Sequence, residues 1–460
     1  MRLKFLDREN ERSRLARAFS RRQGSLCCLY GRRRCGKSRL LLEVLAKRSA
    51  VYYVGDEREP SLQRAALAEA VATLVPGFDQ VTYPDWTSLF ARWWREAPEG
   101  AVLALDEFPY LVGGSRELPS ILQKLIDQHP AKRLHLVVAG SSQRMMHGLM
   151  LDAAAPLYGR AQEIINVGPL GAAWIGKAFG YLRGVELLET YSLWGGIPHY
   201  WELALDHGST WEAVQRLVLD PLGVLHAEPH RLLLDDLRET AQAASVLSLI
   251  GQGCNRISEI AARIEKPVTS LTRPLSRLLE LGLVHREQPF GVSPRSSKKS
   301  LYRIADPFLA FWFRFVEPNR SRLEAGTVKS VAREIEKSVA THYGEVWEML
   351  VRSSIPRLLI EGIEWQPAHR WWGGGTDKNR LEIDVIAESV DGKKLLLGEA
   401  KLAVDAGGLA RVRKELKKKA ARLPFVKDYK QVIERVFVAE AGAHRAADLI
   451  TTQDVFGVLT

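Results

Sequence analysis

Cysteine is scarce in this chain: there are four, Cys27, Cys28, Cys35 and Cys254, among 460 residues. Their spacing matches neither a structural zinc site nor the framework of a disulfide-rich protein. Stabilisation by disulfides or by a cysteine-bound metal is therefore not expected. A reducing environment, and hence a cytoplasmic location, fits this usage.

Long apolar runs are also missing. No stretch approaches the roughly 20 apolar residues that a membrane-spanning helix needs. The N-terminal sequence, Met-Arg-Leu-Lys-Phe-Leu-Asp-Arg-Glu-Asn, lacks the apolar core of a secretion signal. We therefore expect no membrane partner.

Acidic residues are outnumbered by basic ones. Lys and Arg total 65 against 54 Asp and Glu, which gives a formal net charge of +11. This excess favours a polyanionic partner, with nucleic acid first and a membrane surface second, although a solvated basic surface would give the same balance. The chain is otherwise of ordinary globular composition, with 46% hydrophobic residues, and its length suggests about three domains.

One stretch organises the rest of the chain. An apolar run at 26–30 precedes Gly31-Arg32-Arg33-Arg34-Cys35-Gly36-Lys37-Ser38, which fits the P-loop pattern G-x-x-x-x-G-K-[ST]. The glycines let the backbone turn tightly and point its amides at phosphate oxygens. Lys37 is expected to reach the terminal phosphates, and Ser38 to offer a hydroxyl to Mg²⁺. We predict that these eight residues bind ATP with Mg²⁺.

Two acids follow the next strongly apolar run. The apolar stretch 101–105 is followed by Asp106 and Glu107. Asp106 can hold the Mg²⁺ shell, and Glu107 can orient and deprotonate a water molecule. A further apolar run at 134–139 ends near Ser141, which suits either a γ-phosphate sensor or a helix N-cap. Because such runs alternate with helical patterns, we predict an α/β fold with a parallel sheet, whose strand ends bring these groups together.

These motifs resemble those of the archaeal-type ATPases, P-loop proteins of the AAA+/STAND group. The resemblance covers nearly the whole chain. It is carried by Phe5-Leu6-Asp7-Arg8-Glu9, the P-loop, Leu105-Asp106-Glu107-Phe108-Pro109-Tyr110, Ala139-Gly140-Ser141-Ser142, Pro156-Leu157-Tyr158-Gly159-Arg160, Gly195-Gly196-Ile197-Pro198-His199-Tyr200, Tyr302-Arg303-Ile304-Ala305-Asp306-Pro307-Phe308 and Phe311-Trp312-Phe313-Arg314-Phe315.

The resemblance implies roles that spacing alone does not give. Arg160 is similar to an arginine finger or γ-phosphate sensor, with a surface salt bridge as the alternative. Pro198 resembles the proline of a G-x-P lid motif that packs near the adenine, although proline at the first position of a helix would look the same. Arg8 and Phe5 resemble an N-terminal box beside the base. A finger supplied by a neighbouring subunit makes a homo-oligomer or another protein partner compatible with this reading.

The middle of the chain is predicted to hold two further modules after an ATPase core at 1–180. Residues 181–240 read as a helical lid, and residues 241–322 as a winged helix: helix, turn, helix, then two strands around a basic segment. Such a module uses its second helix in the major groove of DNA, or serves only for protein contacts. The candidate DNA contacts are Ser270, Thr272, Arg273 and Arg277 on the helix, and Lys298 and Lys299 on the wing.

Residues 323–460 are predicted to form a restriction-endonuclease-like α/β domain. Asp384 and the strand pattern Glu399-Ala400-Lys401 resemble the D-x(n)-E-x-K core of PD-(D/E)XK nucleases, and Glu348 matches an acidic helix position of that family. The resemblance implies Mg²⁺ ligands in the three acids and a catalytic Lys401. Whether the domain cuts DNA stays open. A basic helix carrying Arg411, Arg413, Lys414, Lys417, Lys418 and Lys419 follows, as a phosphate track or a solvated face.

Two functions are compatible with these patterns. The first is a Mg²⁺-dependent ATPase that binds or acts on DNA, with a C-terminal nuclease-like domain that is either active or not. The second is an ATP-driven conformational switch of the STAND type, which binds DNA or protein and has a non-cleaving C-terminal domain. The rate of hydrolysis distinguishes them.

Overall fold

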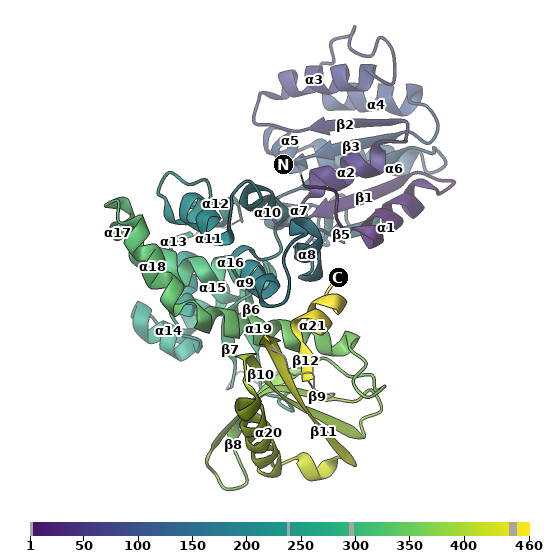
Figure 1. The fold of residues 1–460 in the computed structure, drawn as a ribbon. Helices are drawn as coiled ribbons and strands as arrows, with labels where there is room; N and C mark the ends of the chain where they lie inside the picture. The colour runs from purple at the N-terminus through teal and green to yellow at the C-terminus, as the bar shows by residue number, and fades with distance from the viewer. Residues whose placement is uncertain (1–2, 237–239, 294–298, 441–448) are drawn as a thin grey trace. The chain divides into compact units, whose positions relative to one another are not determined.

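The computed structural model describes residues 3–236, 240–293, 299–440 and 449–460. The chain divides into two compact units, which we call the N-terminal unit (Phe5–Pro169) and the C-terminal unit (Leu170–Thr460 with Met1–Lys4). Figure 1 shows the elements of each. Within the described ranges, no helix is both long and apolar enough to cross a membrane.

The N-terminal unit is built on a five-stranded sheet whose paired strands are all parallel. Its strand order is β2-β3-β4-β1-β5. The strands are β1 (Ser25–Tyr30), β2 (Ala50–Val54), β3 (Val102–Asp106), β4 (His135–Gly140) and β5 (Ala161–Asn166). The predicted parallel α/β sheet is thereby confirmed. Strand β5 was not predicted, because Ala161-Gln162-Glu163 is too polar to read as a buried strand.

Helices connect these strands, and the sequence explains where they form. In α4, apolar side chains recur at helical spacing at Trp86, Leu89, Phe90, Trp93 and Trp94, and all five are buried. The helix begins where the side chain of Asp85 accepts a hydrogen bond from the Ser88 amide. The helices are α1 (Glu9–Phe19), α2 (Lys37–Leu45), α3 (Pro60–Ala72), α4 (Trp86–Glu96), α5 (Phe108–Gly114), α6 (Leu118–Gln128) and α7 (Gln143–Met150).

The register of the sheet aligns three strand ends. Tyr30 at the end of β1 pairs with Gly140 at the end of β4, and Leu105 of β3 pairs with Val138 of β4. The segments that follow β1, β3 and β4 therefore leave the sheet at one edge. These segments are the P-loop, the acidic pair and the Ser141 turn.

The C-terminal unit begins with a helical region, as the sequence predicted. Its helices pack around buried aromatic side chains, including Trp194, Trp201 and Trp312. The chain end returns to this region, where the Ala173 amide donates to the carbonyl oxygen of Leu459. The elements are α8 (Ala173–Phe179), α9 (Val185–Trp194), α10 (Pro198–Ala204), α11 (Thr210–Val214), the π-helix η1 (Gln215–Leu219) and α12 (Glu228–Asp236).

Three helices and a strand pair come next. They are α13 (Thr240–Gly251), α14 (Ile257–Ile264), α15 (Val268–Glu280), β6 (Val284–Glu287) and β7 (Leu301–Ile304). The strands pair antiparallel, with Val284 opposite Ile304. Leu271, Leu275 and Leu278 of α15 are buried, while Ser270, Thr272 and Arg273 are exposed. Lys298, a predicted wing residue, lies outside the described residues.

A set of helices then leads to the last sheet. The single long helix predicted for 334–354 is wrong, because the structure has two helices that meet at Val339. The elements are α16 (Pro307–Phe311), the π-helix η2 (Trp312–Val316), η3 (Glu317–Asn319), α17 (Arg320–Glu324), α18 (Val328–Ser338), α19 (Ala340–Ser354) and η4 (Ile355–Arg357).

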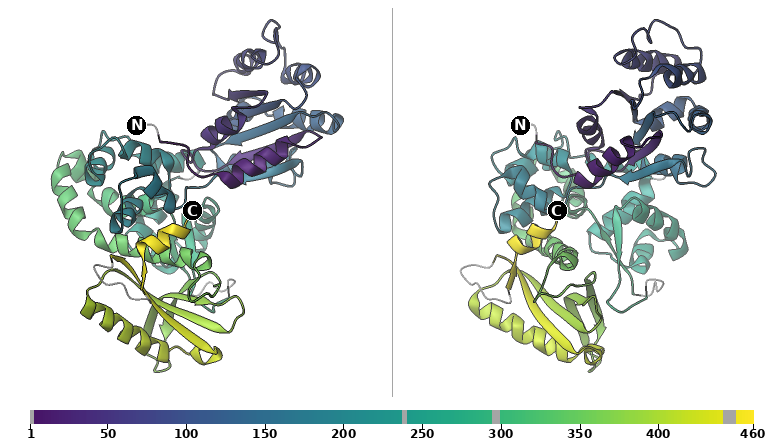
Figure 2. Two further views of the ribbon diagram at one scale, coloured as in Figure 1. Left: turned by 45° about the vertical axis from the view of Figure 1, so that its right-hand side comes forward. Right: turned by 90° about the vertical axis from the view of Figure 1, so that its right-hand side faces the viewer.

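The last sheet has the strand order β12-β11-β10-β9-β8. Strand β9 is antiparallel to both β8 and β10, whereas β10, β11 and β12 are parallel. Leu416 and Ala420 of α20 belong to the core that covers one face, where α20 runs along the sheet (Figure 2). The elements are β8 (His369–Gly374), β9 (Arg380–Glu388), β10 (Lys394–Ala403), α20 (Ala406–Ala421), η5 (Val426–Asp428), β11 (Gln431–Glu440), β12 (Leu449–Thr451) and α21 (Thr452–Val458).

Candidate functional site

The loop after β1 has the backbone that the two glycines permit. Gly31 has φ 143° and Gly36 has φ 92°, both in the region that favours glycine. A Cβ atom on Gly31 would lie 2.3 Å from the carbonyl oxygen of Val167, so no other residue fits there. Gly36 is also the N-cap of α2, so the loop feeds directly into a helix N-terminus. This geometry suits an anion.

Lys37 is held inside this loop. Its side chain is buried, and Nζ donates to the carbonyl oxygens of Gly31, at 2.7 Å, and Arg32, at 3.0 Å. Ser38 follows on the first turn of α2 and is exposed. Of the other loop residues, Arg32 and Cys35 are buried, Arg34 is half-buried and Arg33 is exposed. An ammonium group, a helix N-terminus and a hydroxyl therefore lie on consecutive residues, as phosphate and Mg²⁺ binding requires.

Asp106 ends β3 and is almost fully buried. Its Oδ1 accepts from the Glu107 amide at 2.9 Å, and its Oδ2 accepts from the Tyr52 hydroxyl at 2.7 Å. Burial and the hydrogen bond to Asp106 raise the pKa of Tyr52 well above its usual value, while Ser38 acts in the opposite direction. Tyr52 thus holds Asp106, and the register of the sheet places Asp106 and the P-loop at the same edge.

Sequence reasoning missed Tyr52, which lies on β2. Its place beside Asp106 follows from the parallel pairing of β2 with β3, in which Tyr52 lies opposite Ala104. Only the strand order, which the sequence does not give, makes those two strands neighbours.

Glu107 and Ser141 are also in contact. The Ser141 hydroxyl donates to Glu107 Oε2 at 3.0 Å, and the Ser141 amide lies 3.3 Å from the same oxygen. Glu107 has φ 48°, a left-handed conformation that turns the chain at the end of β3. Ser142, not Ser141, caps the following helix α7. Ser141 therefore contacts the predicted catalytic base.

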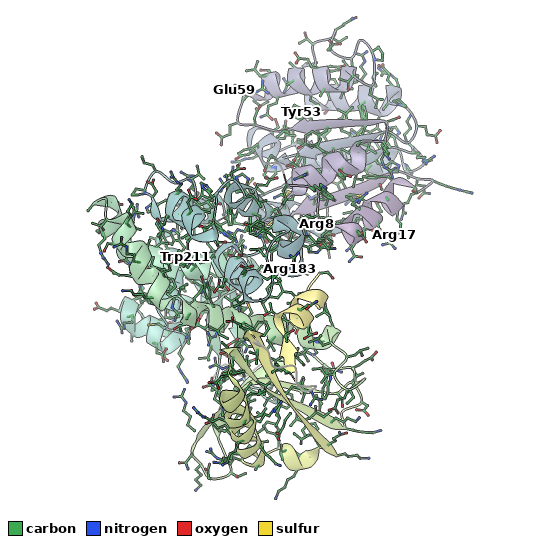
Figure 3. The ribbon with its side chains drawn as sticks, viewed as in Figure 1. Arg8, Arg17, Tyr53, Glu59, Arg183 and Trp211 are labelled. Atoms are coloured by element: carbon green, nitrogen blue, oxygen red, sulfur yellow. The ribbon has the colours of Figure 1, made fainter. Side chains whose placement is uncertain are left out.

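Arg8 anchors the loop from the start of the unit. This buried side chain, labelled in Figure 3, donates through one terminal nitrogen to the carbonyl oxygens of Cys35, at 3.1 Å, and Gly168, at 2.5 Å. The other terminal nitrogen donates to Glu11 at 3.1 Å. Arg8 thus fixes the main chain of the P-loop, and its predicted place beside the base stays a prediction.

Two predicted residues do not join this group. Arg160 pairs with Asp127 at 2.7 Å and precedes β5, whose first residue Ala161 pairs with Leu26 near the start of β1. It therefore lies at the edge of the sheet opposite the P-loop, and a γ-phosphate-sensing role within one chain is wrong. A finger acting on a neighbouring chain stays a prediction. Pro198 is the first residue of α10, in the C-terminal unit.

A second polar cluster lies on the C-terminal sheet. Val385 of β9 pairs with Gly398 of the antiparallel strand β10, so Asp384 and Glu399 lie next to that pair on adjacent strands. Lys401 Nζ lies 2.9 Å from Glu399 Oε2 and 3.5 Å from Asp384 Oδ2. Lys419 of α20 contacts the other Glu399 oxygen at 2.6 Å, and Asp384 also accepts from the Ala400 amide at 3.0 Å. The predicted neighbours Asp384, Glu399 and Lys401 are thus brought together.

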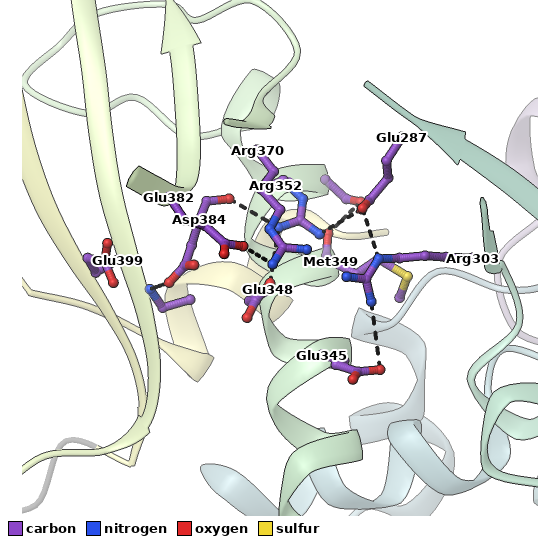
Figure 4. Close-up of polar contacts among 12 residues, drawn as sticks. Glu287, Arg303, Glu345, Glu348, Met349, Arg352, Arg370, Glu382, Asp384 and Glu399 are labelled. Atoms are coloured by element: carbon purple, nitrogen blue, oxygen red, sulfur yellow. Dashed lines mark hydrogen bonds and ion pairs between the residues drawn. The ribbon is translucent and has the colours of Figure 1, made fainter. Parts of the chain in front are cut away.

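Glu348 contacts an arginine that also contacts Asp384. It lies on α19, and Arg352, one turn later, reaches Glu348 Oε2 at 3.5 Å and the main-chain oxygen of Asp384 at 3.1 Å (Figure 4). Burial, followed by the negative charge of Asp384, raises the pKa of Glu348 and also that of Glu399. The carboxylates thus repel one another, and Arg352, Lys401 and Lys419 offset this repulsion by pairing with them.

The predicted three-carboxylate metal set is not assembled. In the ranges that the structure describes, no group of three or more His, Cys, Asp or Glu side chains is placed to hold a metal ion. The reason is that Lys401 and Lys419 occupy the space around Glu399, and Arg352 neutralises Glu348. Lys419, which the sequence assigned to a phosphate track or a solvated face, instead points into this cluster.

The strand order and the groups around the loop agree with the predicted P-loop nucleotide site. Comparison with known proteins gives the class. Residues 5–203 match the family described as an ATPase domain predominantly from Archaea, and residues 312–418 match a family of archaeal and bacterial proteins of unknown function. Residues 5–203 are therefore similar to the archaeal P-loop ATPase domains, and the protein is an ATPase.

Two further comparisons concern most of the chain. An uncharacterised protein of Methanocaldococcus jannaschii, MJECL04, is 28% identical over 401 residues, which is 86% of this chain and 87% of that protein. The solved Walker-type ATPase PABY2304 of Pyrococcus abyssi superimposes with a TM-score of 0.52 at 22% identity, and covers 67% of this chain and 96% of its own. At this identity, the likeness to the Pyrococcus abyssi protein shows a shared fold.

Proposed function

We propose that this protein binds ATP with Mg²⁺ at residues 31–38, hydrolyses it with Glu107 as the base, and uses the cycle to control binding to DNA. The observation that carries the proposal is the meeting of the P-loop, Asp106, Glu107 and Ser141 at one edge of the parallel sheet. Without that meeting, a loop sequence and two acids would be separate features.

The residues present suit the nucleotide. A buried ammonium held by carbonyl oxygens at a helix N-terminus fits a phosphate group. When bound, Mg²⁺ would offset the negative charge that develops on the phosphate during transfer. The chain's own part is then clear: Lys37 orients the terminal phosphate, Ser38 and Asp106 would hold the cation, and Glu107 takes a proton from the attacking water. Ser141 positions the Glu107 carboxylate.

DNA binding is assigned to the module formed by α13, α14, α15 and the β6–β7 pair. Helix, helix, helix and two antiparallel strands follow in the order of a winged helix. On α15 the leucines are buried, whereas Ser270, Thr272 and Arg273 are exposed, as a helix that enters the major groove needs. The net charge of +11 agrees with a polyanionic partner.

The test measures phosphate release and DNA binding on the same purified chain. We expect Mg²⁺-dependent ATP hydrolysis whose rate or DNA affinity changes when the other ligand is added, and DNA affinity that falls steeply with salt. Nucleotide-dependent DNA binding with slow turnover would favour the switch. A DNA affinity that does not respond to salt or to nucleotide would contradict the proposal.

A second function is favoured by one observation: Lys401 lies within 3.5 Å of both Asp384 and Glu399. We propose that this cluster cleaves a phosphodiester bond, with Asp384 and Glu399 as the residues that would hold a divalent cation and Lys401 as the group that stabilises charge. Cleavage of plasmid DNA with Mg²⁺ should disappear in Asp384→Asn and in Lys401→Ala. Cutting that persists in both variants would overturn this assignment.

A further inference from the structure

A basic groove runs beside the acidic cluster, entirely within the C-terminal unit. It has a volume of about 640 Å³ and is formed by strand β6, the end of α19, η4 and the start of β8. Four arginines line it, and we call it the arginine groove. They are Arg286, Arg352, Arg357 and Arg370, with His285 and His369 beside them.

The charge of this groove is unbalanced. Glu287 is the one acidic residue among the described lining residues, and it already serves Arg352, at 3.1 Å, and Arg303, at 2.9 Å. Burial alone would raise the pKa of Glu287, but His285, Arg352 and Arg303 together hold it well below its usual range. This carboxylate therefore stays ionised and shared. Arg352 and Arg370 also pair with Glu348 and Glu382, so the positive surplus of the groove comes from its other lining arginines, of which Arg357 is exposed.

Arg370 is also close to other positive charges in the groove. Burial, together with the positive charges of Arg303 and Arg352, lowers the pKa of its guanidinium, although Glu348 and Glu287 act in the opposite direction. Its Nε is buried and makes no hydrogen bond to any described residue, although the guanidinium pairs with Glu382. A buried guanidinium with an unsatisfied donor is stabilised by an added anion.

The floor of the groove connects to the acidic cluster. Arg352 lines the groove and also donates to the main-chain oxygen of Asp384 and contacts Glu348 (Figure 4). Arg357 lies further along, exposed and without a hydrogen-bond or ion-pair partner among the described residues. The arginines therefore run from the exposed end of η4 to the side of Asp384.

We propose that the arginine groove binds the phosphodiester backbone of a nucleic acid strand and guides it past Asp384. The inference rests on the proposed DNA binding and adds a contact surface away from α15. Arginine is the residue suited to this task, because its planar fork donates two parallel hydrogen bonds to a phosphate. Several arginines in one groove can contact different phosphates of the same strand.

The test uses the double variant Arg286→Gln/Arg357→Gln in the full chain. Its matched control is Arg216→Gln/Arg320→Gln, which removes the same charge at two exposed arginines of the same unit, 68% and 50% exposed. Binding of a fluorescent DNA strand should weaken about tenfold in the groove variant, and its log–log salt slope should fall by about two. The control should lose much less.

A second experiment tests whether DNA lies in the groove itself. Ser353 lies in the groove and is exposed. A photo-crosslinker on Ser353→Cys should capture DNA, with the unsubstituted chain as the control for Cys254. Equal DNA binding in the groove and control variants, together with no capture, would overturn the inference.

Three results separate this inference from the proposed function. If Arg273→Gln weakens DNA binding and the groove variant does not, the α15 proposal stands and the groove is wrong. If the groove variant alone weakens binding, the groove stands and the α15 contact is wrong. If the chain binds polyglutamate but no DNA, and the groove variant weakens that binding, the occupant is an acidic peptide and both proposals are wrong.

Discussion

The two polar clusters of this protein use the same residue types in opposite ways. At the N-terminal site, Lys37 is held by loop carbonyl oxygens, and the acids Asp106 and Glu107 accept from the hydroxyls of Tyr52 and Ser141. At the C-terminal site, Lys401 and Lys419 are ion-paired directly with the acids. The first arrangement holds its carboxylates with hydroxyl groups, whereas the second pairs its carboxylates with lysines.

This difference teaches how charge is stored in a fold. Neutral partners such as carbonyls and hydroxyls fix a charged side chain without cancelling its charge, so an incoming ligand can use it. Ion pairs cancel the charge, so a ligand must first displace a partner. The acids of the proposed N-terminal site can therefore accept a cation by giving up a hydroxyl hydrogen bond, whereas a ligand of the C-terminal cluster must displace Lys401 or Lys419.

The largest effect is expected at Lys37. Lys37→Ala should lower ATP affinity by about a thousandfold or more, because several charge-assisted hydrogen bonds to phosphate are lost together. Binding of a fluorescent ATP analogue measures this, with circular dichroism to check the fold. Lys47→Ala, an exposed lysine beyond α2, is the control and should bind as the unsubstituted chain does. Equal affinities in the two variants would refute the site.

A smaller change is expected at Glu107. Glu107→Gln should retain ATP binding but slow phosphate release at saturating ATP by about a hundredfold, since the general base is lost. Ser141→Ala should lower the rate less, because it removes only the hydroxyl that holds the carboxylate. A Glu107→Gln protein that hydrolyses at the normal rate would remove the base from this position.

The Tyr52 hydroxyl gives a way to sharpen the comparison. Tyr52→Phe frees Asp106 Oδ2 from its 2.7 Å hydrogen bond, and one such bond competes with cation binding. The Mg²⁺ concentration for half-maximal nucleotide binding should therefore fall about fivefold. Tyr53→Phe is the matched control, because the Tyr53 hydroxyl donates to the carbonyl oxygen of Gln63 instead. An identical Mg²⁺ dependence in both would speak against this role.

The smallest effect concerns Glu348 in the C-terminal unit. Its pKa is raised in the folded state, so folding takes up protons, and its contribution to stability is lost as pH rises above the ordinary glutamate range. Glu348→Gln should therefore raise the melting temperature at pH 8 by of the order of 1–2 °C and have less effect near pH 4.5. The exposed Glu336→Gln should show no such pH dependence. A Glu348→Gln protein that is less stable at pH 8 would show that Arg352 dominates.

Local patterns carried most of the N-terminal unit. The P-loop and Asp106–Glu107 could be read from the sequence because a fixed spacing encodes a fixed backbone, and α4 and α6 were placed because their apolar residues recur at helical spacing. Strand β5 and Tyr52 could not be read, since a polar strand start has no signal and strand order is a tertiary property. Arg160 was misplaced for the same reason.

The C-terminal unit shows where sequence reasoning ends. The neighbours Asp384, Glu399 and Lys401 follow from a strand period of two and a short turn between strands. The positions of Glu348, Arg352 and Lys419 do not, because each lies on a helix whose rotation against the sheet is decided by packing. Lys419 in particular looked like one of a row of exposed cations, yet it reaches Glu399 at 2.6 Å.

Hydrogen–deuterium exchange of the full chain, with and without ATP and Mg²⁺, tests the central claim most directly. Nucleotide should slow exchange at residues 31–40, around Asp106 and Glu107, and at Ser141, because all three segments would close on one ligand. Unchanged exchange at these segments, or slowing confined to another part of the chain, would contradict the account.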